Sequence, residues 1–163
     1  MGIRGLEMAT AAIFAMVTAG WTVAGQATAD PIAVVVNPDS PVAEISTASL
    51  RAIYLGQATS LAGAPVLPVN YKSNTPIRTA FEKALMGMEP ERVNEHWKSQ
   101  KFLGFGDNQP VIYTSAEAVK KFVSRQKGGI GYLPLSQVDS TVFLVKKVNG
   151  HDIGGAGYPY QSP

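Results

Sequence analysis

The sequence of 163 residues contains no cysteine and only two histidines, His96 and His151. Without cysteine there can be no disulfide, thiol nucleophile, cysteine-ligated zinc or iron–sulfur cluster. The two histidines lie far apart, and neither has an aspartate or glutamate at ligand spacing, so we expect no metal site. An oxidising compartment permits disulfides but does not require them, so the missing cysteines do not argue against export.

Catalytic motifs and a strong charge bias are missing as well. The sequence has no Gly-x-Ser-x-Gly elbow, Walker loop or paired-carboxylate motif, so we expect a protein that is not an enzyme and has no cofactor. The formal net charge is only +2, and the basic residues form no long runs. This bias is too weak to indicate a nucleic-acid partner, although a mildly basic chain can favour anions.

The N-terminal segment has the order of a secretory signal: Arg4, an apolar stretch from about residue 11 to 23, and Ala27-Thr28-Ala29 before Asp30. It predicts a cleavable signal peptide over residues 1–29 and a periplasmic location for the rest. The alternative is an uncleaved membrane anchor. The apolar stretch is short for that role and is interrupted by polar residues, whereas a span needs about 20 apolar residues.

Residues 30–163 read as one domain in which strands and helices alternate. A β-branched run over 32–36 predicts a buried strand, and Thr75-Pro76 is the best helix start, with an N-cap residue followed by proline. The other expected elements are a helix capped by Ser46 or Thr47, a short edge strand within 64–70, a helix from Pro90, a capping box at Thr114–Glu117, strands at 130–133 and 142–148, and an extended tail over 154–163. This order predicts an α/β fold with a mixed sheet flanked by helices.

Five short motifs occur in the order known from one family of binding proteins. They are Val34-Val35-Val36-Asn37-Pro38, Leu50-Arg51-Ala52-Ile53-Tyr54-Leu55-Gly56, Thr75-Pro76-Ile77-Arg78-Thr79-Ala80-Phe81, Gly129-Ile130-Gly131-Tyr132 and Tyr158-Pro159. Together they resemble the phosphate-binding component of bacterial phosphate ABC transporters. The resemblance implies a type II periplasmic binding protein fold. It covers mainly the second lobe of such proteins, so we expect a compact single-lobe domain that does not transport phosphate unaided.

The family's Ser-Gly-Thr-Arg motif is only partly kept. Thr75 takes the serine position, Pro76 the glycine and Ile77 the threonine, while Arg78 is retained. In the family an arginine stands four positions before the serine, and here that position is Tyr71. Proline removes one N–H donor and isoleucine removes one hydroxyl. The resemblance therefore implies weaker anion binding than in full members of the family.

The candidate site is the predicted helix start at Thr75. Free N–H groups and the helix dipole suit an oxyanion such as phosphate there. Lys72 and Arg78 would supply charge, and hydrogen bonds would come from Ser73, Asn74, Thr75, Thr114 and Ser115. In the alternative interpretation, Thr75 and Ser115 only cap helices and the two cations are solvated. The chain would then be a ligand-free lobe that docks on a membrane sensor or transporter. A homodimer that rebuilds a cleft also remains open.

Overall fold

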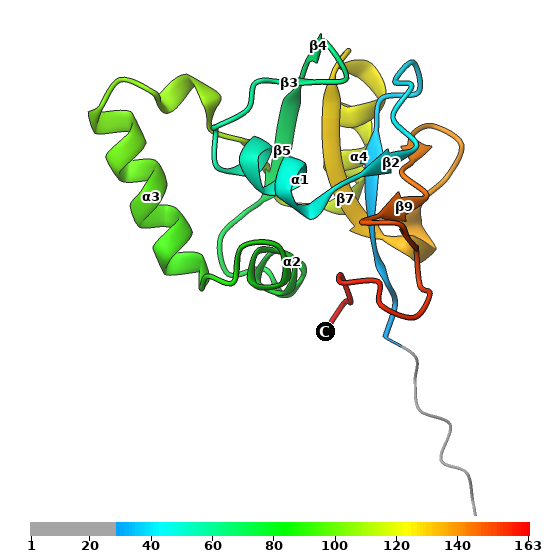
Figure 1. Ribbon diagram of the computed structural model, residues 1–163. Coiled ribbons are helices and arrows are strands. Elements are labelled where there is room, and N and C mark those ends of the chain that lie inside the picture. Colours follow the sequence, from blue (N-terminus) through cyan, green and yellow to red (C-terminus); the bar gives the residue numbers. More distant parts are fainter. Residues whose placement is uncertain (1–28) are drawn as a thin grey trace, which may run out of the picture.

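The computed structural model describes residues 29–163 (Figure 1). The signal peptide predicted for residues 1–29 lies outside the described residues except for Ala29, so it stays a prediction. None of the helices within residues 29–163 has the length and apolar character needed to cross a membrane.

A five-stranded mixed sheet forms the centre of the fold. Its strands, in spatial order, are β6 (Val111–Tyr113), β5 (Leu67–Tyr71), β7 (Gly129–Pro134), β1 (Ile32–Val36) and β8 (Phe143–Leu144). Strand β5 runs parallel to both β6 and β7, whereas β1 is antiparallel to β7 and β8. The predicted combination of parallel and antiparallel pairing is confirmed.

The remaining short strands and turns lie outside the central sheet. They are β2 (Glu44–Ile45), β9 (Lys147–Val148) and β10 (His151–Asp152) in a three-stranded sheet, the hairpin of β3 (Ser60–Leu61) and β4 (Ala64–Pro65), and the 3-10 turns η1 (Gly106–Asn108) and η2 (Leu135–Gln137).

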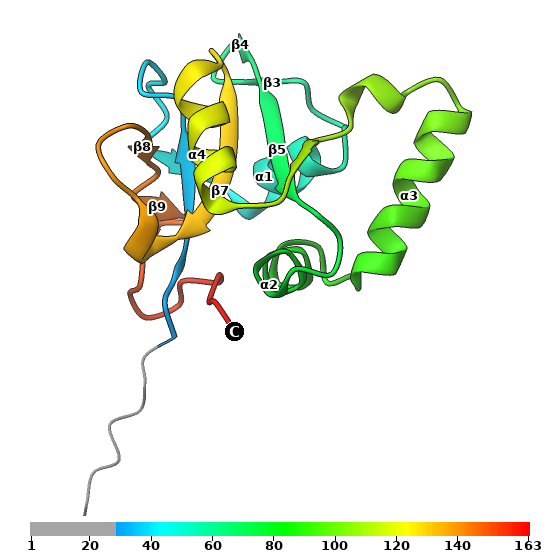
Figure 2. The same ribbon diagram turned by 180° about the vertical axis from the view of Figure 1, so that it is seen from behind.

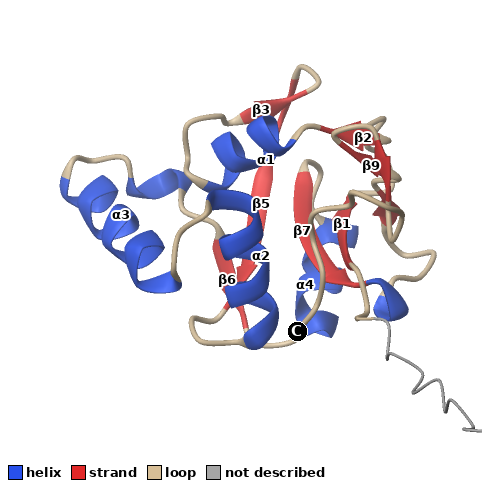
Figure 3. Ribbon diagram, turned by 60° about the horizontal axis from the view of Figure 1, so that its bottom comes forward, coloured by secondary structure: helices blue, strands red, loops and turns tan. Residues whose placement is uncertain are grey.

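Within residues 29–163, four α-helices lie against or beside the central sheet. They are α1 (Thr47–Tyr54), α2 (Pro76–Met86), α3 (Pro90–Phe102) and α4 (Ala116–Arg125). Helices α2 and α4 lie on opposite sides of the sheet (Figure 3). Helix α3 stands to one side, beyond β5 and β6, in both opposite views (Figures 1 and 2). The expected mixed sheet flanked by helices is therefore confirmed.

Aromatic side chains fill the core between α2 and the sheet. The rings of Phe81 and Tyr132 stack with centroids 3.8 Å apart, and Tyr54 meets Phe81 edge-on at 5.4 Å. The C-terminal tail, predicted to pack as extended coil, brings Tyr160 to 5.1 Å from Phe81. All four side chains are buried. Strand β1 is buried along its whole length, as its β-branched run predicts.

Two strand predictions require correction. The segment 64–70 does not form an edge strand, because β5 lies between β6 and β7. Pro68 is tolerated there since the pairing with β6 begins only at Val69, so no strand on that side needs the missing N–H. The single strand predicted over 142–148 is also wrong. In this segment β8 pairs with β1 in the central sheet, and β9 pairs with β2 in the three-stranded sheet. Two short strands therefore replace the one predicted.

Candidate functional site

Two helix starts lie at the same edge of the central sheet. Strands β5 and β6 are parallel with Tyr71 opposite Tyr113, and the Lys72 amide donates to the Tyr113 carbonyl at 2.8 Å. Each strand leads through a short connection into a helix, β5 into α2 and β6 into α4. The fold thus brings residues 72–75 together with residues 114–115. In open α/β sheets, ligands bind outside the carboxyl ends of the strands, which is where this edge lies.

The start of α2 receives no side-chain cap. Thr75 occupies the N-cap position, but its hydroxyl donates to the Lys72 carbonyl at 3.0 Å instead of accepting from the helix. Asn74 adopts a positive φ of 68°, which turns the chain into the helix. Pro76 has no N–H, so the first free amides of α2 belong to the two residues that follow it. The prediction that the Thr75 side chain caps the helix is therefore wrong, and these amides stay available to an external acceptor.

The start of α4 is capped by its own sequence. The Ser115 hydroxyl accepts from the Ala118 amide at 3.2 Å, so Ser115 is the N-cap. The predicted capping box, with Thr114 as the cap, is displaced by one residue. Glu117 consequently lies at the second helical position, too early to reach back, and pairs with Lys120 at 2.7 Å. Thr114 and Ser115 remain exposed at the edge.

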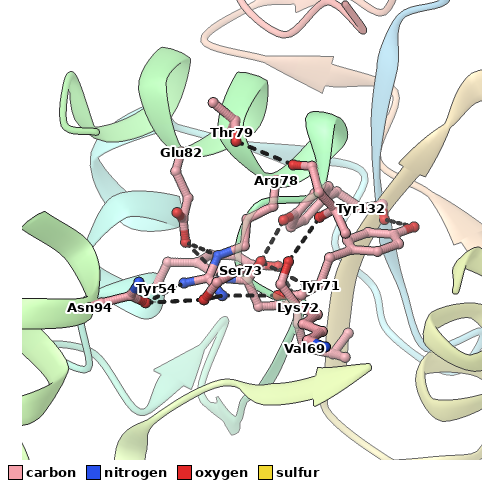
Figure 4. Close-up of polar contacts among 12 residues, drawn as sticks. Tyr54, Val69, Tyr71, Lys72, Ser73, Arg78, Thr79, Glu82, Asn94 and Tyr132 are labelled. Carbon is pink, nitrogen blue, oxygen red and sulfur yellow. Dashed lines mark hydrogen bonds and ion pairs between the residues drawn. The ribbon is translucent and has the colours of Figure 1, made fainter. Parts of the chain in front are cut away.

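Arg78 points inward, behind the loop between β5 and α2. It is 4% exposed, and its Nε donates to Oε1 of Glu82 at 2.8 Å. One Nη1 donates to the Tyr71 carbonyl at 2.9 Å and to Ser73 Oγ at 3.2 Å (Figure 4). Nη2 donates to Asn94 Oδ1 on α3 at 3.3 Å. The alternative in which Arg78 is solvated is therefore wrong, because its guanidinium is buried and makes these four hydrogen bonds inside the protein.

Glu82 anchors the other end of this network. Its side chain is fully buried, and Oε1 also accepts from Asn70 Nδ2 at 2.8 Å, while Oε2 has no partner within the described chain. Burial raises the pKa of Glu82, against the opposing effects of Arg78 and the hydrogen bonds. The Tyr132 hydroxyl donates to Asn70 Oδ1, which joins the network to the aromatic core.

The solvent-facing part of the candidate site is small and polar. Lys72 and Asn74 are exposed, and Ser73 and Thr75 are partly buried. Because Arg78 is buried and paired, Lys72 is the cation of the predicted set that faces solvent. The arrangement offers one positive charge, hydroxyl groups and backbone amides, which can hold an anion without any proton transfer.

The sequence interpretation did not anticipate Glu82, Asn70 or Asn94. Glu82 lies four residues after Arg78, a spacing that places the two side chains on one face of a helix, and this was the available signal. Asn94 belongs to a different helix, and no local pattern points to it. In residues 29–163, no group of three or more histidine, aspartate or glutamate side chains lies close enough to hold a metal ion.

Comparison with known proteins shows which solved structures have a similar fold. No protein-family model matches the chain. Among solved structures it resembles a protein with bound phosphate from Clostridium perfringens, named as a phosphate ABC transporter substrate-binding protein, with 24% identity, a TM-score of 0.60 and 76% of this chain covered. It also resembles an ABC-type phosphate transport receptor from Vibrio cholerae, with 21% identity, a TM-score of 0.59 and 74% covered. PstS from Borrelia burgdorferi follows, with 17% identity, a TM-score of 0.55 and 75% covered.

The chain spans less than half of each of these structures, 46%, 47% and 48% respectively. The resemblance inferred from the sequence is confirmed at the level of the fold. The domain has the fold of part of a phosphate-transport binding protein.

Proposed function

We propose that this chain is an exported, periplasmic binding module that holds phosphate or a related oxyanion weakly at the carboxyl edge of β5 and β6. The observation that carries the proposal is the uncapped start of α2 beside the exposed Lys72. Free first-turn amides and the helix dipole attract an anion, and a side-chain cap would compete with it. The phosphate bound to a solved neighbour of the same fold supports the choice of ligand.

The proposed roles follow from the placement of each side chain. Lys72 supplies the charge, and Thr75, Asn74 and Ser73 supply hydrogen bonds on the β5 side. Thr114 and Ser115 approach from the β6 side of the same edge. Arg78 contributes indirectly, because it holds the Tyr71 carbonyl and the Ser73 hydroxyl that shape the loop. The site is open and carries one exposed cation, so weak binding is expected.

Thermal unfolding of the purified protein against phosphate, sulfate, phosphonate and chloride at matched ionic strength tests the proposal. A ligand that binds only the folded state adds about 2.7 kcal/mol at 100 times its dissociation constant, which a melting curve resolves. We expect a phosphate-selective rise that Lys72→Ala removes. Lys127→Ala is the matched control, since Lys127 is also exposed but precedes β7 and lies at the other end of the strands. A flat response to every anion would contradict oxyanion binding.

A second candidate function is a ligand-free lobe that docks on a membrane sensor or transporter. Glu82 neutralises Arg78, and Pro76 and Ile77 lack donors that the family motif supplies, so the edge has fewer anion contacts than that motif would provide. This function predicts melting curves that no anion shifts and co-purification with a membrane protein. A second copy of the chain is a further candidate partner.

Export is tested separately by the N-terminal sequence of protein recovered from the periplasmic fraction. Cleavage after Ala29 predicts a chain that begins at Asp30. An intact N-terminus in the membrane fraction would instead indicate an uncleaved anchor.

A further inference from the structure

Most of the exposed large apolar side chains lie away from the proposed anion site. Phe102, Leu103 and Phe105 follow one another at the C-terminal end of α3, and they are 92%, 62% and 58% exposed. We call these three residues the α3 tip. The tip precedes η1 and β6 in the chain, so it lies toward the amino end of β6, whereas the anion site lies at the carboxyl end. Helix α3 stands to the side of the domain in Figures 1 and 2.

A cavity of about 260 Å³ lies beside the tip on the same chain. Its apolar lining includes Leu67 and Val111, each 43% exposed, together with the buried Val66 and Ile53. We call it the β5–η1 cavity, because residues 107–109 of and after η1 form its other wall. A cavity of 150 Å³ holds a benzene molecule, so this one accommodates a phenyl ring. None of the three tip residues lines this cavity, so within one chain the tip does not fill it.

The tip and the cavity also carry charges of opposite sign. Lys101 stands immediately before the tip, and Asp107 lines the β5–η1 cavity. Both are exposed, and within the described chain neither belongs to an ion pair. The α3 tip therefore has a cation next to it, and the neighbouring β5–η1 cavity has an anion in its lining.

We propose that this surface binds a second copy of the chain in a two-fold dimer, in which the tip of each copy enters the β5–η1 cavity of the other. A two-fold interface requires a self-complementary patch, where one set of residues contacts a second set and the reverse holds as well. The tip and the cavity meet that requirement in apolar character and charge. Lys101 of each copy then lies against Asp107 of the partner. The surface is small, so the dimer is expected to be weak and concentration-dependent.

Sedimentation equilibrium of the protein expressed from the full chain, over a wide range of concentration, measures the dimer. We expect reversible dimerisation, and the double variant F102S/F105S should raise the dissociation constant at least tenfold because it removes the aromatic anchors. Ile112→Ser is the matched control. Ile112 is 42% exposed on β6 next to Val111 but does not line the cavity, so the variant should dimerise like the native chain.

Charge reversal distinguishes contact between copies from an effect within one copy. Lys101→Asp alone and Asp107→Lys alone should each weaken self-association, because each places like charges together across the two-fold axis. An equimolar mixture of the two variants should restore dimers as mixed pairs, since both contacts then join opposite charges. No interaction within one chain can produce that recovery.

Three results would overturn the proposal. They are a native protein that stays monomeric at its highest soluble concentration, a dimer that F102S/F105S leaves unchanged, and a mixture of charge variants that shows no recovery. Co-sedimentation of a monomeric native protein with phosphatidylglycerol vesicles, lost in F102S/F105S, would assign the tip to a membrane surface instead.

Discussion

Arg78 and Glu82, one turn apart on α2, form an ion pair of 2.8 Å in which both side chains are buried. Arg78 also holds the Tyr71 carbonyl and the Ser73 hydroxyl, while Glu82 accepts from Asn70 on β5. The pair therefore links the aromatic core to the loop that begins the candidate anion site. Its energetics determine how firmly that loop is held.

Replacing Arg78 by methionine should destabilise the domain strongly. The carboxylate of Glu82 would then be buried without its counter-charge, which typically costs about 3–5 kcal/mol. Chemical denaturation monitored by tryptophan fluorescence measures the loss, since Trp97 is buried on α3. The double variant R78M/E82L is the control, because apolar replacement of both partners often restores stability. A loss below about 1 kcal/mol in the single variant would show that the pair contributes little.

The pH dependence of stability should carry the signature of Glu82. Its pKa is raised in the folded state above the ordinary value of 4.5, chiefly by burial. A raised pKa means that the folded chain binds the proton more tightly, so this contribution is fully present below pH 4.5 and is lost as pH rises through the folded pKa. Glu82→Gln removes the titrating group, and its free energy of unfolding should fall less steeply over that window. Parallel curves for the two proteins would contradict the raised pKa.

Restoring the missing donors at the start of α2 should strengthen anion binding. The variant P76G/I77T returns one N–H and one hydroxyl to the edge, and a hydrogen bond to a charged group contributes about 1.5–3 kcal/mol. We expect phosphate affinity to rise about tenfold or more by calorimetry, since 1.4 kcal/mol corresponds to a factor of ten. Pro65→Gly makes the same proline-to-glycine change in β4, which precedes β5 and so lies at the opposite end of that strand from the anion site, and should leave affinity unchanged. Unaltered binding in P76G/I77T would remove the α2 start as the site.

Much of the fold follows from local patterns in the sequence. Pro76 and Pro90 begin helices where their missing N–H is not needed, and the β-branched run 32–36 forms a buried strand. The errors occur where distant pairing decides the outcome. Pro68 suggests an edge position, but the short β6 leaves its side of β5 unpaired, and a central strand results.

The candidate site shows a similar division. The predicted site combines the segments after β5 and β6, and the parallel pairing places both helix starts at one edge. The orientation of Arg78 is not local information. It depends on Asn94 from α3 and on the burial of Glu82, and both contacts exist only after the helices have packed. Sequence patterns identify a cation near the site but not whether it faces the solvent.

Gly128 sets the approach of the start of β5 to β7, at the end of the sheet opposite the anion site. Its carbonyl accepts from the Leu67 amide at 2.8 Å, its φ is +81°, and an added Cβ would collide with the Pro65 carbonyl. Gly128→Ala should therefore cost about 2 kcal/mol or more in the free energy of unfolding and displace the start of β5. Gly63→Ala separates the two causes, since Gly63 has the same φ of +81° but nothing within 4 Å of an added Cβ. Gly63→Ala should cost only the strain of the left-handed backbone, about 1–2 kcal/mol. Equal losses in the two variants would mean that the start of β5 can shift away from Gly128 at little cost.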